Sequence, residues 1–451
     1  MSEALLLGLG GLVALILLIG LRMPIAYAMI LVGGLGTMLI NGPALVLNQL
    51  NTLAYGQFSI YDLSVVPMFV LMGAIASRIG LSQALFRAAN AWLGWLPGGT
   101  AMAAIAGCAG FGAVCGSSLA TASTMGKVAL PELRRYNYSP ALSTGTLAAG
   151  GVLGILIPPS VVLIIYAIIV ETNIVTMFMA AFIPGMLAVI LFIATIAIYV
   201  AIRPEAAPKG GKLSRTEFWE ATLGMTPVLV IFGMVIGGIY FGLFNPTPAA
   251  AVGVFLILAL GLVRRRLSRD DLKTCLLETA STTGMIYLIL LGAEMLKIFM
   301  SRSGLPQEAA LWVAQSGMPP MTVMAVMLIA LILLGCLMDS LSMILLVIPF
   351  FWPALVEVNG GIYQMAEGSG FGMSTEDLKV WFGILSLIVV ELGLITPPVG
   401  MNVFVISAIA RDVPMIETFK GVMPFFCAEV LRVLILLSFP ILTLWLPAVL
   451  R

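Results

Sequence analysis

The stretch GFGAVCGSSLATASTMGKVALP at residues 110–131 decides the fold of this chain. It is apolar enough to enter a membrane, yet its middle carries Gly116 and five hydroxyl side chains, namely Ser117, Ser118, Thr121, Ser123 and Thr124. A bilayer accepts irregular backbone at membrane depth only where protein or a water-filled site satisfies it. We therefore interpret CGSSLAT at 115–121 as the tip of a helical hairpin that dips into the membrane and returns, next to a binding site.

The composition predicts a protein embedded in a lipid bilayer. Of the 451 residues, 61% are hydrophobic and only 10% are charged, whereas a soluble domain keeps about a quarter of its residues charged. Apolar runs long enough to span a membrane recur from Ala4 to Leu446. Unsatisfied backbone groups are costly in lipid, so these spans should be helices. We expect an all-α polytopic membrane protein.

Residue types that are missing or few exclude several functions. The chain contains no histidine, so histidine-dependent metalloproteases, serine hydrolases and haem proteins cannot be built from it. The nearest approach to a phosphate-binding loop, Gly210-Gly211-Lys212-Leu213, lacks the glycine spacing and the hydroxyl residue that ATP hydrolysis requires. The five cysteines include no CxxC pair, and we expect small buried side chains without disulfide or metal roles.

Two sequence matches predict an internal repeat. SRIGLS at 77–82 resembles SRSGLP at 301–306, and GILIPPS at 154–160 resembles GLITPPV at 393–399, in the same order along the chain. Each half then holds two scaffold spans, a third span, a hairpin, a helix interrupted by Pro-Pro and a closing span. Hairpin legs of about 15 residues reach only about 22 Å, short of the roughly 30 Å hydrocarbon core. They should therefore be re-entrant, which leaves five crossings per half and inverts the second repeat.

The predicted boundaries follow from these matches. The first inverted repeat is 1–203, a cytoplasmic linker is 204–224, and the second inverted repeat is 225–451. In chain order we expect scaffold spans at 4–41, a hairpin at 100–133, a broken helix at 139–171, scaffold spans at 225–263, a hairpin at 321–356 and a broken helix at 378–410. With the N-terminus outside, most lysines and arginines fall on the linker side of the membrane, as the positive-inside rule requires.

The two Pro-Pro pairs predict cation sites. Pro158-Pro159 and Pro397-Pro398 remove amide donors, and this should free the carbonyls of the preceding turns, Gly154 to Ile157 and Gly393 to Thr396. Freed carbonyl oxygens at a helix C-terminal end suit a hard cation such as Na⁺. One hairpin tip meeting one broken helix in each half would form two related cation sites.

The half-helices that follow the breaks predict an anion pocket. They begin at Ser160 and at Val399-Gly400 and present amides with a positive dipole end. Each element also has a plainer interpretation, because proline pairs occur as simple kinks and small-residue runs pack helices closely. Four such elements paired by a repeat are harder to explain by packing.

Asp339 is the most informative single residue, because it lies in LMDSLSM at 337–343, the tip of the second hairpin. A carboxylate at the bilayer centre costs roughly 2.5 to 3.5 kcal/mol on the insertion scale. It could balance a bound cation, or it could cap the amides of the following leg. Asn402, one turn into the half-helix, could line the pocket or form an interhelical hydrogen bond.

Other intramembrane charges have structural interpretations. Glu429 and Arg432 are spaced i,i+3, as are Glu294 and Lys297, so we expect each pair to form an ion pair. Glu391 lies just before the second Pro-Pro pair, and both a site role and a scaffold role stay open for it.

At these residues the sequence resembles the large membrane subunit of a tripartite ATP-independent periplasmic (TRAP) transporter. The resemblance covers essentially the whole chain, and its carriers are GAVCGSSLATASTMGKVALPEL, GGVLGILIPPSVVLIIY, GCLMDSLSMILLVIPFFWP and ELGLITPPVGMNVFVI. It implies a Na⁺-driven secondary transporter of a bacterial or archaeal inner membrane that moves an organic acid by an elevator-like motion of the hairpins. It also implies two partners, a small four-helix membrane subunit and a periplasmic substrate-binding protein, and no organic cofactor or nucleic acid.

The resemblance also implies the site residues. Carried over onto this chain, the sodium ligands are Cys115, Ser118, Gly154, Ile157 and Pro159 for the first site, and Gly335, Asp339, Gly393, Thr396 and Val399 for the second. Many members of the family have serine where Cys115 stands, and whether Cys115 would act by its thiol or its carbonyl stays open. For the substrate we expect contacts from the tips and half-helix starts, at Ser117, Ser118, Thr121, Ser160, Ser340, Ser342, Pro398, Gly400 and Asn402.

Alternatives remain at this stage. A stand-alone Na⁺-coupled dicarboxylate or citrate carrier of the same fold class would need no soluble partner. A channel should show rings of polar residues through a pore, and an enzyme should show a catalytic constellation; the sequence favours neither. The amphipathic stretches Ala44 to Ser64 and Asp270 to Gly284 would be lateral arms of the scaffold or simple interfacial connectors.

Overall fold

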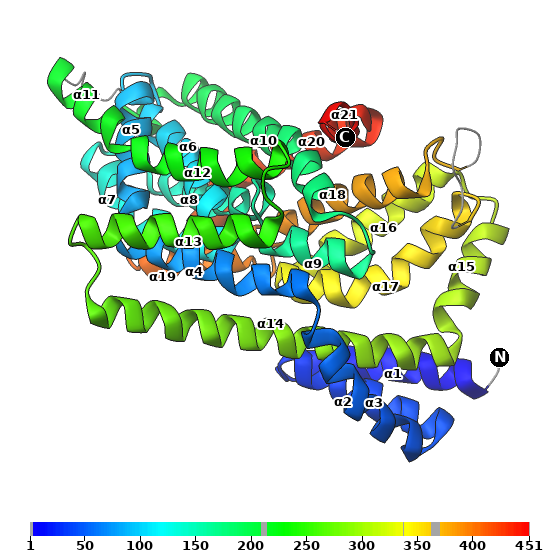
Figure 1. Ribbon diagram of the computed structural model, residues 1–451. Helices are drawn as coiled ribbons and strands as arrows, with labels where there is room; N and C mark the ends of the chain where they lie inside the picture. The colour runs from blue at the N-terminus through cyan, green and yellow to red at the C-terminus, as the bar shows by residue number, and fades with distance from the viewer. Residues whose placement is uncertain (1–2, 209–213, 337, 362–369, 451) are drawn as a thin grey trace. The chain divides into compact units, whose positions relative to one another are not determined.

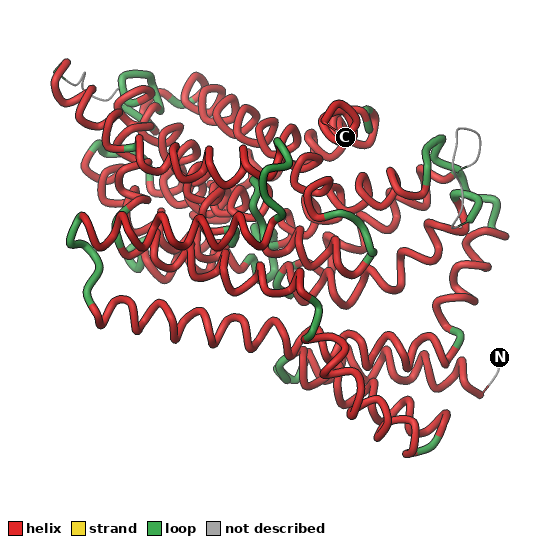
Figure 2. The backbone as a smooth tube through the Cα atoms, in the orientation of Figure 1, coloured by secondary structure: helices red, strands yellow, loops and turns green. Residues whose placement is uncertain are grey.

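The computed structural model of the protein describes residues 3–208, 214–336, 338–361 and 370–450. These residues form helices joined by short connections, and no strand is found among them (Figure 1, Figure 2). The all-α prediction is therefore confirmed. Two predicted features lie partly outside the described residues: the linker, at 209–213, and the tip of the second hairpin, at 337.

Most of the helices are long and strongly apolar, as the composition predicts. In chain order the helices are α1 (Glu3–Gly20), α2 (Ile25–Asn41), α3 (Pro43–Phe58), the 3₁₀ helix η1 (Tyr61–Ser64), α4 (Val65–Arg78), α5 (Leu81–Leu93), α6 (Gly99–Cys115), α7 (Ser118–Arg135), α8 (Pro140–Leu156), α9 (Val161–Ile169), α10 (Ile174–Ile202), the 3₁₀ helix η2 (Pro204–Ala206), α11 (Arg215–Gly224), α12 (Thr226–Tyr240), α13 (Pro246–Val263), α14 (Arg269–Ser303), α15 (Leu305–Gln315), α16 (Pro320–Gly335), α17 (Ser340–Val358), α18 (Thr375–Gly393), α19 (Met401–Ile409), α20 (Met415–Ser438) and α21 (Ile441–Leu450).

Eight of the described helices are long and apolar enough to cross a membrane, or nine if the bent pair α8 and α9 is one span. They are α1, η1 with α4, α10, α11 with α12, α13, α14, α17 and α20. This count is lower than the ten crossings expected from the sequence, partly because α2, with 17 residues, is among the shorter apolar helices.

The hairpin legs differ in length from the prediction. Three of them, α6, α7 and α16, have 17, 18 and 16 residues, close to the expected 15. The fourth leg, α17, has 19 residues and is long enough to span, so the expected length is wrong for this leg. Pro349 and Pro353 lie inside α17 without ending it, because a membrane helix can satisfy the backbone groups that a proline frees.

The stretch Asp270 to Gly284 is part of α14, a single helix of 35 residues. In the first half, by contrast, the corresponding region is divided into α3, η1 and α4. In the first half α3 ends at Phe58, with Ser59 as its C-cap, and a 3₁₀ turn follows, whereas α14 contains no proline and continues as one helix.

The chain divides into two compact units, and each is described by itself. The first unit comprises Met1–Ser64, Ala280–Ala330 and Leu341–Lys379. Within it, glycines of α2 bring that helix against the second part of α14: a Cβ at Gly33 would lie 2.7 Å from the backbone nitrogen of Leu296, and a Cβ at Gly36 would lie 2.4 Å from the ring of Phe299. Small residues commonly allow such close approach between membrane helices.

The second unit comprises Val65–Thr279, Leu331–Ser340 and Val380–Arg451. Its central element is α8, which contacts α6, α7, α19 and α20 and is buried all round from Leu142 to Leu156. Backbones touch where α8 crosses α20, since a Cβ at Gly145 would lie 2.3 Å from the carbonyl carbon of Gly421. Beside this crossing, the Thr418 hydroxyl donates a hydrogen bond to the Thr144 hydroxyl at 3.0 Å. The predicted first hairpin and first broken helix thus form the core of this unit.

Both predicted intrahelical ion pairs are confirmed. Arg432 donates a short hydrogen bond to Glu429, and both side chains are fully buried. On α14, Lys297 Nζ lies 3.7 Å from Glu294 Oε1. These pairs were predictable because residues three apart on a helix are neighbours whatever surrounds them.

The cysteines are free, and three of them, Cys108, Cys275 and Cys336, are buried as predicted. Cys115 is partly exposed and Cys427 is exposed, so the prediction of burial is wrong for Cys427. The reason is that α20 has an outward apolar face, on which Met423 and Leu434 are exposed as well.

The predicted linker contains a helix, α11. Its N-terminus carries a capping box, in which the Ser214 hydroxyl accepts from the Glu217 amide at 3.3 Å and the Glu217 carboxylate accepts from the Ser214 amide at 2.9 Å. The Trp92 indole donates a hydrogen bond to Thr222 at 3.2 Å, which attaches α11 to α5.

Candidate functional site

The first hairpin tip is a tight turn with its own caps. Helix α6 ends at Cys115, and Gly116 follows at φ +65, a left-handed conformation that suits glycine. Ser117 is then the N-cap of α7, and its hydroxyl accepts from the amide of Ala120 at 3.5 Å. Each end of the interruption therefore has a local cap, and the non-helical tip lies where the sequence predicts it.

The first broken helix is bent at its proline pair. Helices α8 and α9 are related by a bend of 45°. Ser160, which is fully buried, caps α9 by accepting from the amide of Leu163 at 3.4 Å. The start of α9 thus has the N-terminal amides and the positive dipole end that the sequence predicts.

The hairpin tip lies directly against this break. A Cβ at Gly112 would lie 2.6 Å from Gly154 Cα, and a Cβ at Gly116 would lie 2.9 Å from the carbonyl oxygen of Pro159. On the other side of the contact, a Cβ at Gly154 would lie 2.5 Å from both the carbonyl oxygen of Ser117 and the hydroxyl of Thr121. The structure therefore brings two of the residues predicted for the first cation site, Gly154 and Pro159, against the hairpin tip, through glycines that let backbone oxygens approach.

Two buried polar atoms at this contact lack hydrogen-bond partners among the described residues: the hydroxyl of Thr121 and the side-chain oxygen of Asn402. Both side chains are fully buried. The Asn402 amide nitrogen donates to the Ala148 carbonyl at 3.3 Å, so the interhelical hydrogen bond that the sequence allowed is formed, and only the side-chain oxygen of Asn402 lacks a partner among the described residues. Buried polar atoms in proteins are nearly always hydrogen-bonded, so these two oxygens are available to an ion, a ligand or water. Other buried hydroxyls without a partner among the described residues, such as those of Thr146 and Ser386, lie elsewhere on α8 and α18.

The second broken helix differs from the first. Helix α18 ends at Gly393, and a Cβ there would lie 2.5 Å from the carbonyl carbon of Gly335 at the end of α16, so tip and break are again in backbone contact. However, the Gly393 carbonyl accepts from the Thr396 amide at 3.1 Å and the Leu394 carbonyl from the Asn402 amide at 3.0 Å. The expectation that these carbonyls are freed is wrong for these two, because the chain after the break turns back to bond them. A carbonyl has a second lone pair, which still permits a cation contact.

The two breaks also differ in burial. Ile157 to Ser160 are buried, whereas Pro397 and Pro398 are exposed and Thr396 and Val399 are partly exposed. Asp339 is partly exposed too. Gly400, at φ +60, begins α19 in a left-handed conformation that favours glycine.

The predicted substrate residues are divided between the two units. Ser117, Ser118, Thr121, Ser160, Ser340, Pro398, Gly400 and Asn402 lie in the second unit, and Ser342, which is buried, lies in the first. No predicted sodium ligand lies in the first unit. Among the residues that the structure describes, no three histidine, cysteine or acidic side chains converge as a metal site. The converging oxygens are hydroxyls, amides and backbone carbonyls, the donors expected for a hard cation rather than for a transition metal.

Glu391 is bonded to two of the predicted site residues, although the sequence left open whether its role is in the site or in the scaffold. Its carboxylate is fully buried and accepts a short hydrogen bond from Ser118 and a second one, at 2.5 Å, from Ser340. The signal in the sequence was an acidic residue inside an apolar helix two positions before Gly393. Such an acidic residue indicates a structural or functional role, but the sequence does not identify its hydrogen-bond partners.

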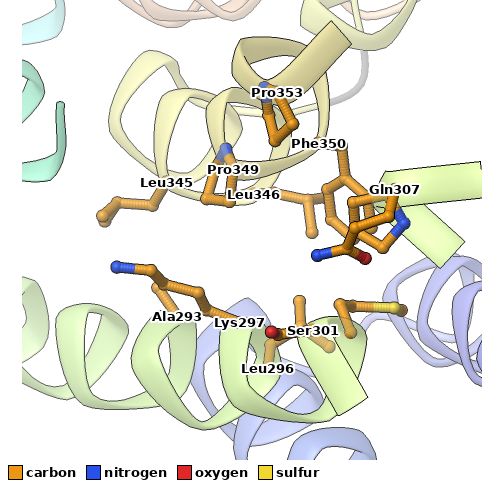
Figure 3. Close-up of a pocket in the computed structure, with 12 residues that line it drawn as sticks. Ala293, Leu296, Lys297, Ser301, Gln307, Leu345, Leu346, Pro349, Phe350 and Pro353 are labelled. Atoms are coloured by element: carbon orange, nitrogen blue, oxygen red, sulfur yellow. The ribbon is translucent and has the colours of Figure 1, made fainter. Parts of the chain in front are cut away.

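A separate cavity of about 160 Å³ lies within the first unit, between α14, α15 and α17 (Figure 3). Figure 3 shows Lys297 on one wall and Leu345 and Pro349 on the opposite wall, with Gln307 near Phe350. None of the predicted site residues lines it. The cavity is therefore distinct from the candidate site.

Known transporter subunits are similar to this chain over most of its length. A family model described as "Tripartite ATP-independent periplasmic transporter, DctM component" matches residues 12–442. The chain is 33% identical over 390 residues to the C4-dicarboxylate TRAP transporter large permease protein DctM of Pseudomonas aeruginosa, covering 86% of this chain and 85% of that protein. It is 29% identical to the sialic acid TRAP transporter large permease protein SiaM of Vibrio cholerae, over 94% of this chain and 95% of that protein.

Two further proteins are similar to this chain. The isethionate TRAP transporter permease protein DctMQ of Oleidesulfovibrio alaskensis is 29% identical, over 89% of this chain but only 60% of that longer protein. Among solved structures, the YdaH transporter of Alcanivorax borkumensis is similar with a TM-score of 0.61 and 15% identity, over 87% of this chain and 88% of that one. At this identity the likeness concerns the fold alone.

Proposed function

The chain belongs to the DctM family of tripartite ATP-independent periplasmic transporters, as their large membrane subunit, and from this premise we propose that it imports an organic acid in symport with Na⁺. The acid is delivered by a periplasmic binding protein. The names of the relatives include C4-dicarboxylate, sialic acid and isethionate transporters, so the substrate is a small organic anion of this range.

One observation carries the proposal. Helices α7, α8 and α19 contact one another in one unit, and two buried oxygens on α7 and α19, Thr121 Oγ1 and Asn402 Oδ1, lack partners among the described residues. A bound Na⁺ ion and the organic acid would supply those hydrogen-bond and coordination partners. Helix N-termini at Ser160 and Gly400 add positive dipole ends near an anion.

The sodium ligands that we propose are those implied by the resemblance to the family. For the first site we propose the oxygens at Cys115, Ser118, Gly154, Ile157 and Pro159, and for the second those at Gly335, Asp339, Gly393, Thr396 and Val399. The support is the close contact of each tip with its break, Gly112 with Gly154 and Gly335 with Gly393. Since the Ser118 hydroxyl is bound to Glu391, its contribution to the first site would come through its second lone pair or its carbonyl.

The transport cycle we propose is of the elevator type. The hairpins and broken helices would move together as the carrier against a scaffold made of the first two spans of each half, α1 with α2 and α12 with α13. The two halves would be inverted repeats, with the N-terminus outside the inner membrane. The small four-helix membrane subunit would complete the scaffold.

The test is uptake in proteoliposomes that contain this chain and its small membrane subunit, with the binding protein outside. An inward Na⁺ gradient should drive accumulation of the acid, and an equal K⁺ gradient should not. Succinate, sialic acid and isethionate would be compared as substrates. Equal uptake under both gradients would overturn the sodium coupling, and uptake without any binding protein would favour a stand-alone carrier.

A further inference from the structure

Glu391 joins the tips of the two hairpins inside the second unit. Its Oε2 accepts from the hydroxyl of Ser118, and its Oε1 accepts from the hydroxyl of Ser340 at 2.5 Å. The three side chains are buried. Ser118 and Ser340 are 222 positions apart in the sequence, yet each is the first residue of a returning hairpin leg, α7 or α17, and each is followed by leucine.

Burial opposes a charge on the carboxylate, and the helix starts beside Glu391 offset part of this cost. The first turn of a helix carries unpaired amides and a partial positive charge, which stabilise a negative group nearby. Glu391 lies against the first residues of two such helices at once. In the first broken helix the matching position before GILIPP is Val152, so the two hairpins share one carboxylate.

Another buried carboxylate in the same unit shows a different arrangement. Glu429 is bound by Arg432 on its own helix, and Arg432 also donates to the Pro184 carbonyl at 3.3 Å. The hydrogen bonds described for that pair link α20 to α10. The hydrogen bonds described for Glu391, in contrast, come from the two tips.

We propose that Glu391 is a positioning residue that ties the two hairpin tips together, so that ion binding at one tip orders the other. This rests on the proposed Na⁺ symport. Ser118 belongs to the proposed first cation site, and Ser340 follows Asp339 of the proposed second site. A single carboxylate that holds both serines gives the two sites a shared rigid element, and a shared element is what makes two binding events interdependent.

The chemistry of the carboxylate suggests the variant that tests this. An ionised carboxylate accepts at both oxygens, whereas a glutamine side chain of nearly the same size has only one acceptor oxygen and presents an amide donor at the other position. Glu391→Gln therefore keeps the packing but lets only one serine donate as before. Ser386→Ala is the matched control, because Ser386 is a buried hydroxyl on α18 without a hydrogen-bond partner among the described residues.

The first measurement is the Na⁺ dependence of uptake in proteoliposomes with both partner proteins. In the wild type we expect a Hill coefficient well above one. In Glu391→Gln it should fall towards one, and the Na⁺ concentration for half-maximal uptake should rise about tenfold, the size typical of coupling between sites. Ser386→Ala should match the wild type, and thermal unfolding in detergent should show that Glu391→Gln is folded.

The second measurement separates positioning from mere stability. Ser118→Ala and Ser340→Ala are combined in the wild-type background and again in Glu391→Gln. The effects of the two serine variants on half-maximal Na⁺ should be non-additive when Glu391 is present and additive when it is replaced. A residue that only stabilised the fold would not change this additivity.

The outcomes distinguish the two proposals. If the wild type takes up substrate without regard to Na⁺, the proposed function fails. If the wild type is Na⁺-dependent but Glu391→Gln keeps its cooperativity, or the serine effects add equally in both backgrounds, the inference about Glu391 is overturned while the proposed function stands.

Discussion

Gly154 and Thr121 lie so close that a Cβ on the glycine would be 2.5 Å from the threonine hydroxyl. The end of α8 therefore rests against the first turn of α7. The same Cβ would be 2.5 Å from the carbonyl oxygen of Ser117. Because Gly154 has no side chain, oxygens of the hairpin tip can lie close to the end of the broken helix.

Replacing Gly154 by alanine should disrupt the site. The added methyl group would meet backbone and a short side chain, neither of which can move away easily, and overpacking of this kind typically costs about 1–3 kcal/mol. We expect Gly154→Ala to lower Na⁺-driven uptake at least tenfold. Gly237→Ala on α12 is the control, because nothing lies within 4 Å of its added carbon. Wild-type uptake in Gly154→Ala would contradict this account of the contact.

Thr121→Val should reduce transport without lowering thermal stability. The Thr121 hydroxyl is buried and has no hydrogen-bond partner among the described residues, so an isosteric apolar side chain should leave thermal stability unchanged or raise it slightly. If the hydroxyl contacts the ion or the acid, uptake should fall about tenfold, as expected for the loss of one hydrogen bond to a charged group. Thr146→Val, another buried hydroxyl of this kind on α8, should leave uptake unchanged. Equal uptake in both variants would remove Thr121 from the site.

Variants of Asp339 should distinguish a cation ligand from a helix cap. Asp339→Ala should abolish gradient-driven uptake while membrane insertion, measured by yield and size-exclusion profile, stays normal. Asparagine caps helices about as well as aspartate but carries no charge. Asp339→Asn should therefore also be inactive if the carboxylate balances a cation. Activity in Asp339→Asn together with loss in Asp339→Ala would assign the residue to capping.

The buried ion pair of α20 should affect the thermal stability of the protein. Glu429 and Arg432 are both fully buried, so removing one partner leaves an uncompensated charge, which typically costs 3–5 kcal/mol, an order-of-magnitude figure. Glu429→Leu and Arg432→Leu should each lower the melting temperature in detergent strongly. The double variant should be more stable than either single variant, because it removes both charges together. If the double variant were the least stable of the three, the desolvation argument would fail.

Much of the fold was predictable because its causes are local. Hydrophobicity and length predict apolar helices, and the hydroxyl-rich run after Cys115 and the proline pairs predict where helices are interrupted. The ion pair of Glu429 and Arg432 was predictable for the same reason, since helical geometry alone makes the two residues neighbours. Cys427 was wrongly expected to be buried because apolar composition does not tell a lipid-facing position from an interior one.

What the sequence determined by itself, then, is the set of helices, their breaks and the polar side chains at those breaks, because each depends on residues within a few turns of one another. Only the tertiary structure decided which of these polar groups meet. Asn402 is 254 positions from Ala148, and Glu391 is 273 positions from Ser118. Such contacts depend on the path of the whole chain, and no local periodicity or spacing encodes them.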